Sequence, residues 1–193
     1  MNLQHIAVKI FACPPCDIDP SALIPVFHAW IQSKASNDML LIDVADYAHV
    51  HDGPGVLLMG HEGYFGFGHD HGGLGLTYAN KRLATGTTQD RLRQALHRAL
   101  TAANRLANEP PVVEQLHFDV SRLLIAVDDR LDAPNTAQSF AALKGDIETV
   151  LADLYDGDQV KLEQIEDPKT ALRVKATITT KTDLPTLTQR TVA

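Results

Sequence analysis

Residues 49–78, HVHDGPGVLLMGHEGYFGFGHDHGGLGLTY, hold five of the nine histidines and nine of the twelve glycines of this 193-residue chain. Three apolar segments inside the stretch, residues 56–59, 64–68 and 74–78, have the length and composition of β-strands. Glu62-Gly63 suits a hairpin turn between the first two segments. The stretch therefore predicts neighbouring strands joined by tight, glycine-rich turns.

Around this stretch the sequence predicts three principal helices and further strands. The clearest helix begins at residues 85–88 and ends at Asn108, because apolar residues recur there at helical spacing. A shorter helix is expected from about residue 24 to residue 33, after the start signal at residues 19–21, and a third from residue 136 to residue 157. The further strands are expected at residues 6–12, 39–44, 116–120, 123–127, 160–165 and 172–178.

The order of these elements predicts the fold class. Helices do not alternate singly with strands, which disfavours a doubly wound parallel sheet. We therefore predict an α+β fold in which three principal helices pack on a mainly antiparallel sheet. The order also suggests ferredoxin-like halves, residues 1–84 and 85–178, within one compact domain. Residues 179–193 are polar and Thr-rich, so we expect a loose tail there.

Local patterns add more detailed expectations. Residues 39–44, MLLIDV, are apolar enough for a central strand, and residues 121–122 are either a turn or a bulge in one long strand. Loops are expected at residues 36–38 and 166–168. Three arginines of the second helix recur every seven residues opposite its apolar face, which predicts a solvent-exposed row. They are Arg91, Arg98 and Arg105.

Composition limits the classes of function. The chain has 17 basic and 24 acidic residues, a net charge of −7, which argues against general nucleic-acid binding because that requires clustered Lys and Arg. The longest apolar runs have about five residues, whereas a membrane-spanning helix needs about 20. The N-terminal residues do not resemble a signal peptide, so the expected location is the cytoplasm. A structural disulfide between Cys13 and Cys16 is not expected in that compartment.

The histidines suggest a transition-metal site. Histidines two residues apart point to the same side of an extended chain, and imidazoles with a carboxylate suit zinc or a related metal. Standard spacing such as HExxH is absent, so solvated or core histidines are the structural alternative. The candidate metal ligands are His49, His51, His61, His69 and His71.

The cysteines and glycines admit functional and structural interpretations. Cys13-Pro14-Pro15-Cys16 follows a strand, as a thioredoxin-type redox motif would, but the double proline is unusual and the helix begins later. The two thiols are therefore redox groups, metal ligands or packing residues, and packing is favoured. Gly66-x-Gly68 and Gly73-x-Gly75 precede another strand rather than a helix, so we expect structural roles and not phosphate binding.

Acid–base chemistry is a second possibility for the same stretch. His61 and Glu62 are the candidate acid–base pair. Lys81 and Arg82 lie at a strand end before a helix, where two cations could hold an anionic substrate. The candidate ligand-binding residues upstream of the pair are Asp43, Asp46 and Tyr47.

Several strings in the chain resemble a family of uncharacterised bacterial proteins of about this length. They are LLIDVADYAHV at residues 40–50, GPGVLLMGHE at 53–62, the segment at 73–78 and FHAWIQ at 27–32. The resemblance centres on Asp43, Asp46, Tyr47, the GPG turn and His61-Glu62. It implies no catalytic role, because no activity is established for that family.

Three hypotheses of function follow from the sequence. The first is a binding domain with a His/Asp/Glu site for a transition metal such as zinc or for a small ligand. The second is a small enzyme that uses His61 and Glu62 on an anionic substrate. The third is a homo-oligomeric structural or assembly protein whose glycine-rich strands lie at an interface. The sequence does not identify a ligand or a substrate.

Overall fold

A computed structural model describes residues 3–34, 39–167 and 169–191. Its sheet contains strands β1 (Ile6–Ala12), β2 (Leu41–Tyr47), β3 (Gly55–Gly60), β4 (Gly63–Gly68), β5 (Gly75–Asn80), β6 (Phe118–Val127), β7 (Gln159–Gln164) and β8 (Leu172–Thr179). The helices of the described part are η1 (Pro20–Leu23), a single 3-10 turn, and α1 (Ile24–Gln32), α2 (Thr88–Leu106), α3 (Ala137–Leu154) and α4 (Leu184–Arg190). The expected start of the first α-helix near residue 24 is confirmed.

The eight strands form one sheet in the order β2-β3-β4-β5-β1-β6-β8-β7, and every neighbouring pair is antiparallel. The predicted α+β class with a mainly antiparallel sheet is confirmed. β1 is followed by α1 and pairs with the β4–β5 hairpin, while β6 is followed by α3 and pairs with the β7–β8 hairpin. The two halves of the sheet therefore meet at the β1–β6 pair.

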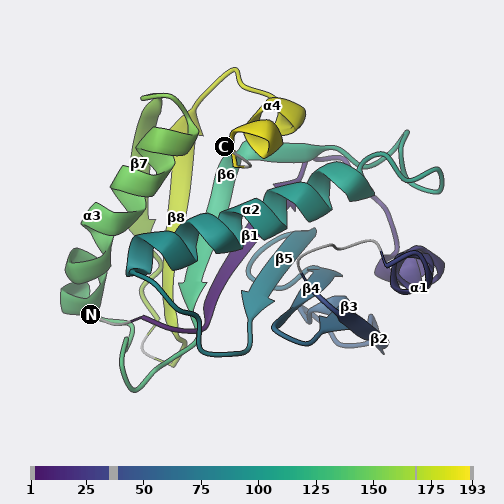
Figure 1. The fold of residues 1–193 in the computed structure, drawn as a ribbon, viewed down its shortest axis with the longest axis horizontal. Coiled ribbons are helices and arrows are strands. Elements are labelled where there is room, and N and C mark those ends of the chain that lie inside the picture. The colour runs from purple at the N-terminus through teal and green to yellow at the C-terminus, as the bar shows by residue number, and fades with distance from the viewer. Residues whose placement is uncertain (1–2, 35–38, 168, 192–193) are drawn as a thin grey trace.

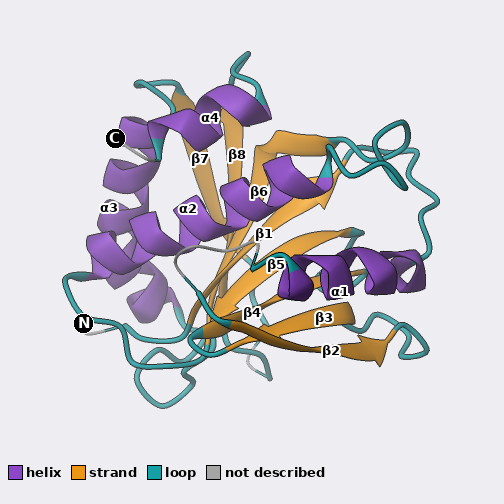
Figure 2. Cartoon of the chain, turned by 45° about the vertical axis from the view of Figure 1, so that its right-hand side comes forward, coloured by secondary structure: helices purple, strands orange, loops and turns teal. Residues whose placement is uncertain are grey.

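The helices cover one face of the sheet (Figures 1 and 2). α2 crosses the central strands and contacts β1, β5, α3 and α4. Side chains of β1 alternate, so that Val8 and Ile10 join the core beneath the helices while Lys9 points to the opposite face. Three small residues in register, Ala7, Ala79 and Ala126, form a separate cluster on that opposite face.

The position of β2 differs from the expectation. The apolar composition of residues 39–44 predicted a central strand, but β2 is the edge strand and pairs only with β3 in the described part of the chain. Leu40 and Ile42 are 67% and 55% exposed. An apolar run reports local composition, whereas an edge position depends on which distant strand pairs with it.

The long strand β6 resolves the alternatives for Ser121-Arg122. β6 is continuous from Phe118 to Val127, and its register against β1 shifts between Ile10 and Phe11. The extra residues therefore form a bulge rather than a turn, which bends β6 where it crosses the end of β1.

The arginines of α2 do not form a solvent-exposed row, so that prediction was wrong. Arg91 and Arg98 are only 8% and 7% exposed. The Arg91 guanidinium donates hydrogen bonds to the carbonyl oxygens of Leu3, Ala84 and Gly86, and Arg98 donates to the Tyr78 hydroxyl. The partners of these two arginines belong to the N-terminal segment, to the connection before α2 and to β5. These segments cover the polar side of α2 at Arg91 and Arg98, so that side lies in the interior.

The expected loose tail is also corrected. Residues 184–190 form α4, which begins at Asp183 as its N-cap and buries Leu184 and Leu187. Its contacts are mainly with α2. The sequence LPTLTQR has only two apolar side chains at helical spacing, too few to identify a docked helix from periodicity. Residues 192–193 of the expected tail, the loop at 36–38 and residue 168 lie outside the described residues.

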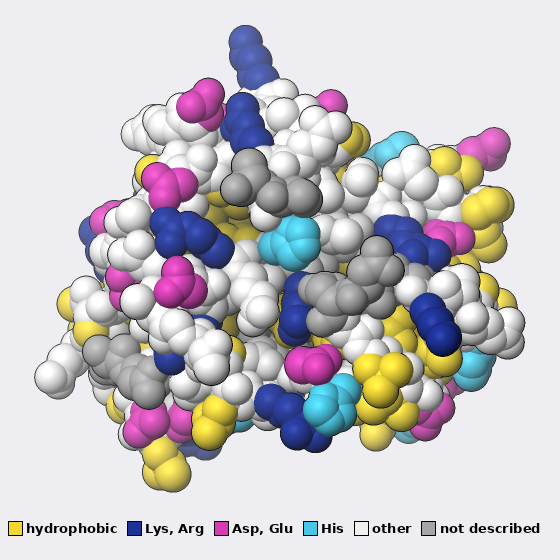
Figure 3. Space-filling view, viewed as in Figure 1, with side chains coloured by type: hydrophobic (Ala, Val, Ile, Leu, Met, Phe, Trp, Pro, Cys, Tyr) yellow, Lys and Arg dark blue, Asp and Glu magenta, His cyan; other side chains and the backbone are white. Residues whose placement is uncertain are grey.

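The face that carries the helices has a mixed surface. Figure 3 shows basic and acidic side chains interspersed across it. The helices in the described ranges include none that combines the length and the apolar character needed to cross a membrane.

Candidate functional site

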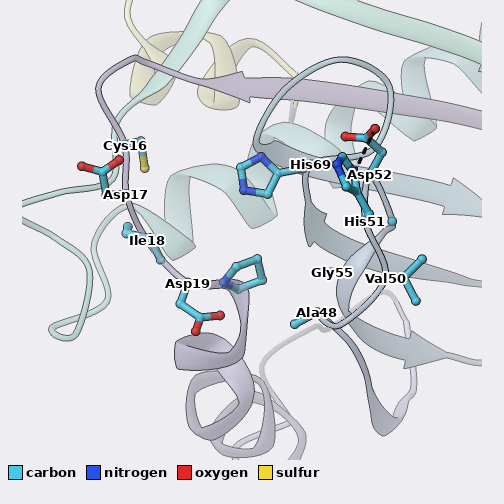
Figure 4. A pocket seen from close by; sticks show the side chains of 12 residues that line it. Cys16, Asp17, Ile18, Asp19, Ala48, Val50, His51, Asp52, Gly55 and His69 are labelled. Carbon is cyan, nitrogen blue, oxygen red and sulfur yellow. Dashed lines mark ion pairs between the residues drawn. The ribbon is translucent and has the colours of Figure 1, made fainter.

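An open pocket of about 520 Å³ lies beside the end of the sheet at which β1 leaves for α1 (Figure 4). Three segments that are distant in the sequence form it: residues 16–20 before α1, residues 48–55 between β2 and β3, and His69 after β4. The lining residues are Cys16, Asp17, Ile18, Asp19, Pro20, Ala48, Val50, His51, Asp52, Gly53, Gly55 and His69.

Local turns fix the wall made by residues 48–55. The Asp46 carboxylate accepts a hydrogen bond from the Ala48 amide, the Val50 amide donates to the Tyr47 carbonyl, and the Gly53 amide donates to the Val50 carbonyl. Gly55 has a φ of +67°, and a Cβ there would lie 1.9 Å from the Phe67 carbonyl oxygen. The glycine therefore permits the close approach of β3 and β4 that shapes this side of the pocket.

The polar side chains of the pocket give it an anionic character. The twelve lining residues include three aspartates, Asp17, Asp19 and Asp52, and neither Lys nor Arg. Asp52 lies 3.1 Å from the His51 ring at the exposed rim, as the dashed line in Figure 4 marks. Asp19 also serves as the N-cap of η1, where hydrogen bonds from the Ser21 hydroxyl and amide lower the pKa of its carboxyl.

The two cysteines lie on the segment between β1 and η1. Cys16 lines the pocket, and both Cys13 and Cys16 are free thiols. Burial, with the Asp119 carboxylate, raises the pKa of the Cys13 thiol, whereas a reactive thiol usually has a lowered pKa. This favours the packing interpretation of the CPPC sequence.

Residues 69–73 connect the pocket with a buried lysine on the helix-free face of the sheet. Lys9 is 1% exposed, and its ammonium group donates hydrogen bonds to the Gly68 carbonyl (3.1 Å), the Asp70 carbonyl (2.5 Å) and the Asp70 carboxylate (2.5 Å). Burial lowers the pKa of Lys9, although the Asp70 carboxylate opposes that shift. Sequence reasoning missed Lys9, and the one signal for it was a single charge within the apolar strand IAVKIFA.

His71 extends this charged cluster. Its ring nitrogen Nε2 lies 3.3 Å from the second carboxylate oxygen of Asp70, and its backbone has a φ of +59°, which is uncommon outside glycine. Burial lowers the pKa of His71, and the Asp70 carboxylate acts against that shift. Burial also raises the pKa of the nearby Tyr64. Groups with shifted pKa values, namely Lys9, His71 and Tyr64, therefore lie on the helix-free face of the sheet.

The five histidines predicted as metal ligands lie at different places in the structure, and the metal site stays a prediction. His51 and His69 line the pocket, His49 stacks on Tyr47, His61 lies at the β3–β4 turn and His71 lies beyond the pocket wall. Within residues 3–34, 39–167 and 169–191, no group of three or more His, Cys, Asp or Glu side chains could hold a metal ion. The histidines are separated because they belong to three different connections between strands. His49 and His51 lie between β2 and β3, His61 lies between β3 and β4, and His69 and His71 lie between β4 and β5.

The predicted acid–base pair lies at the β3–β4 turn, outside the pocket. His61 Nδ1 is 3.1 Å from the Glu62 carboxylate, and these side chains are 46% and 39% exposed. The Arg82 guanidinium donates to the His61 carbonyl, and the Lys81 amide donates to the Glu62 carbonyl. Partial burial raises the pKa of Glu62, but hydrogen bonding to His61 and the charge of Arg98 produce a net lowering.

The remaining candidate ligand-binding residues belong to the edge strand β2. Asp43 accepts a hydrogen bond from the Val44 amide, and Asp46 holds the turn at Ala48. Tyr47 is 44% exposed and is stacked on His49. These residues shape the approach to the pocket wall, but they are not among its lining residues.

Comparison with known proteins does not identify a relative. No protein family model matches the chain, and neither a curated protein nor a solved structure matches it. The family resemblance expected from the sequence strings therefore stays a prediction.

Proposed function

We propose that this protein is a binding domain for a small organic cation, held in the pocket between residues 16–20, residues 48–55 and His69. The observation that carries the proposal is the composition of the pocket wall. Three aspartates and two histidines are among its lining residues, without a Lys or Arg. An ammonium group would gain charge-assisted hydrogen bonds to carboxylates there, whereas an anion would meet repulsion.

The size of the pocket supports a small ligand. Its volume of about 520 Å³ lies within the range of about 300–1,000 Å³ that is usual for small-molecule sites. Ile18 and Val50 add apolar surface beside the carboxylates. A short aliphatic amine has both properties, because its charged ends suit carboxylates and its methylene groups suit these apolar side chains.

The other hypotheses have less support from the described residues. A transition metal would need a group of ligands that this part of the chain does not bring together. The His61–Glu62 pair lies outside the pocket, so the enzyme hypothesis stays a prediction. The oligomer hypothesis also stays a prediction, and β4 and β5, which carry many of the glycines, are interior strands of the sheet.

Titration with putrescine tests the proposal, and 1,4-butanediol is its uncharged counterpart of the same chain length. We expect putrescine to shift the NMR signals of the His51 and His69 rings and butanediol to leave them unchanged. Because exposed charges are screened, the affinity should fall as salt is raised from low concentration to about 0.15 M. Equal responses to the two compounds, or none to putrescine, would contradict the proposal.

The substitution Asp52→Asn tests the contribution of a pocket carboxylate, and Asp156→Asn is its matched control. Both aspartates have positive φ values, +51° and +55°, which Asn tolerates, and both changes remove one negative charge. Asp52 lines the pocket, whereas Asp156 follows α3. We expect Asp52→Asn to weaken putrescine binding about threefold, since one exposed charge contributes less than about 1 kcal/mol, and Asp156→Asn to have no effect.

A further inference from the structure

The residues on both sides of His69 are bonded through their carbonyl groups to one buried ammonium group. Gly68 precedes His69 in the chain and Asp70 follows it, and the carbonyl oxygens of both accept hydrogen bonds from Lys9 Nζ. The third bond of Lys9 goes to the Asp70 carboxylate. An ammonium group has three donors, so all three are used within residues 68–70.

Asp70 also links this cluster to the pocket wall that residues 48–55 form. Its amide donates a hydrogen bond of 3.1 Å to the carbonyl of Gly53, a lining residue of the pocket. The segment that carries His69 is therefore bonded to Lys9 beneath it and to the β2–β3 connection beside it. In Figure 4 the His69 ring lies between the segment at Cys16 and the turn at His51.

Lys9 lies on a strand at the centre of the sheet. β1 lies between β5 and β6 at the centre of the sheet, and Lys9 is in register with Thr77 on one side and Leu124 on the other. Its side chain is buried, so water does not compete for its three bonds. Residues 69–73, by contrast, form a connection between strands, and His69 is exposed.

We propose that Lys9 is a positioning residue of the pocket, which fixes His69 in the ligand-facing orientation by bonding to the chain on both sides of it. The effect of Lys9 on ligand binding rests on the proposed function. The positioning of His69 does not, because it can be measured in the ligand-free protein. Arg would not replace Lys9, because a planar guanidinium does not direct three bonds toward one short segment as an ammonium does. Met has a similar length, no donors and no charge, so it removes the three hydrogen bonds together with the ion pair to Asp70.

Hydrogen exchange in the ligand-free protein tests the positioning. In Lys9→Met we expect the residue-70 amide to exchange about tenfold faster than in the wild type, because local opening of residues 68–70 costs less without the ammonium group. The His69 ring signal should shift at the same time. Lys175→Met is the matched control, since Lys175 is exposed on β8 and points to the same face of the sheet. It should leave both signals unchanged.

The affinity for putrescine separates this role from a general loss of stability. We expect Lys9→Met, at a temperature where circular dichroism shows it folded, to bind putrescine about threefold more weakly, because His69 must then be ordered on binding. Asp70→Asn should weaken binding to a similar extent, and the double variant should be no weaker than either single variant, since the two residues act as one unit.

The outcomes distinguish the two proposals. Unchanged residue-70 exchange and an unchanged His69 signal in folded Lys9→Met would overturn the positioning role whatever putrescine does. Faster exchange in a protein whose wild type does not bind putrescine would support the positioning role and reject the proposed ligand. If Lys9→Met does not fold, Asp70→Asn is measured instead, and exchange at residue 70 within twofold of the wild type would overturn the proposal.

Discussion

The Lys9 ammonium lies 2.5 Å from the Asp70 carboxylate, although 61 positions separate the two residues in the sequence. The same carboxylate approaches His71 with its other oxygen, at 3.3 Å. One acidic side chain is thus shared between a buried lysine and a half-buried histidine. The charge on His71 therefore affects the group that holds the pocket segment in place.

The stability of the protein should fall as pH decreases through the range in which histidine is protonated. Burial lowers the pKa of His71 from its ordinary value of 6.5, so the folded state binds fewer protons than the unfolded state between the two pKa values. This contribution to stability is present above pH 6.5 and is lost as pH falls toward the pKa of the folded state. His71→Asn, which tolerates the positive φ, should lose less stability than the wild type between pH 7.5 and about pH 5.

Urea unfolding at a series of pH values measures this difference. His28→Gln is the control, since His28 is an exposed residue of α1. It should follow the wild-type pH profile. An identical profile for His71→Asn and the wild type would show that His71 is protonated equally in the folded and unfolded states.

Arg98→Met should destabilise the protein by about 2 kcal/mol, because the substitution leaves the buried Tyr78 hydroxyl without its charged partner. The Arg98 guanidinium also lies 5.5 Å from the centre of the Tyr78 ring. Arg93→Met, at an exposed position of the same helix, should change stability by less than about 0.5 kcal/mol. Thermal unfolding of the two variants distinguishes a buried arginine from a solvated one, and equal effects would contradict the interior position of Arg98.

Leu187→Ala should destabilise the protein by about 3 kcal/mol, since Leu187 of α4 is fully buried and its removal leaves a cavity. Leu131, which is 95% exposed, supplies the comparison, and Leu131→Ala should have an effect within about 0.5 kcal/mol. Chemical denaturation measures both. A mild effect of Leu187→Ala would indicate that residues 184–190 are not docked in solution.

Two glycine-to-alanine substitutions should have opposite signs. Gly145 lies within α3 with open space where a methyl group would be added, so Gly145→Ala should stabilise the protein by up to about 1 kcal/mol. Gly55→Ala should destabilise it by at least about 2 kcal/mol, because the position has a positive φ and no room for a Cβ. Differential scanning calorimetry measures the change in melting temperature of each variant. Changes of the same sign would contradict either the open space at Gly145 or the crowded backbone at Gly55.

Much of the secondary structure was predictable because it depends on neighbours in the sequence. The β3–β4 hairpin, whose turn was predicted at Glu62-Gly63 and lies at residues 61–62, the α2 helix and the strands of the C-terminal hairpin follow from periodicity and turn chemistry. The α+β class followed from their order. Strand order and edge position did not, and the apolar run at residues 39–44 became an edge strand through its pairing with β3 alone.

The candidate site was predictable only in part. The sequence pointed to the histidine-rich stretch, and His51 and His69 do line the pocket. It could not show that residues 16–20 form the facing wall, since that contact depends on the path from β1 to α1. It also could not show that Lys9 lies under the pocket segment, because the strand pattern alone does not identify the side chain that meets Asp70.

Local sequence patterns were sufficient to predict most of the helices and strands and the α+β class, but not α4. Three features depend on contacts between distant segments: the separation of the five histidines, the interior position of two arginines of α2 and the contact between Lys9 and Asp70. The physical reason is that periodicity encodes which side of an element is apolar. Which distant segment covers that side depends on strand pairing and helix docking across the whole chain.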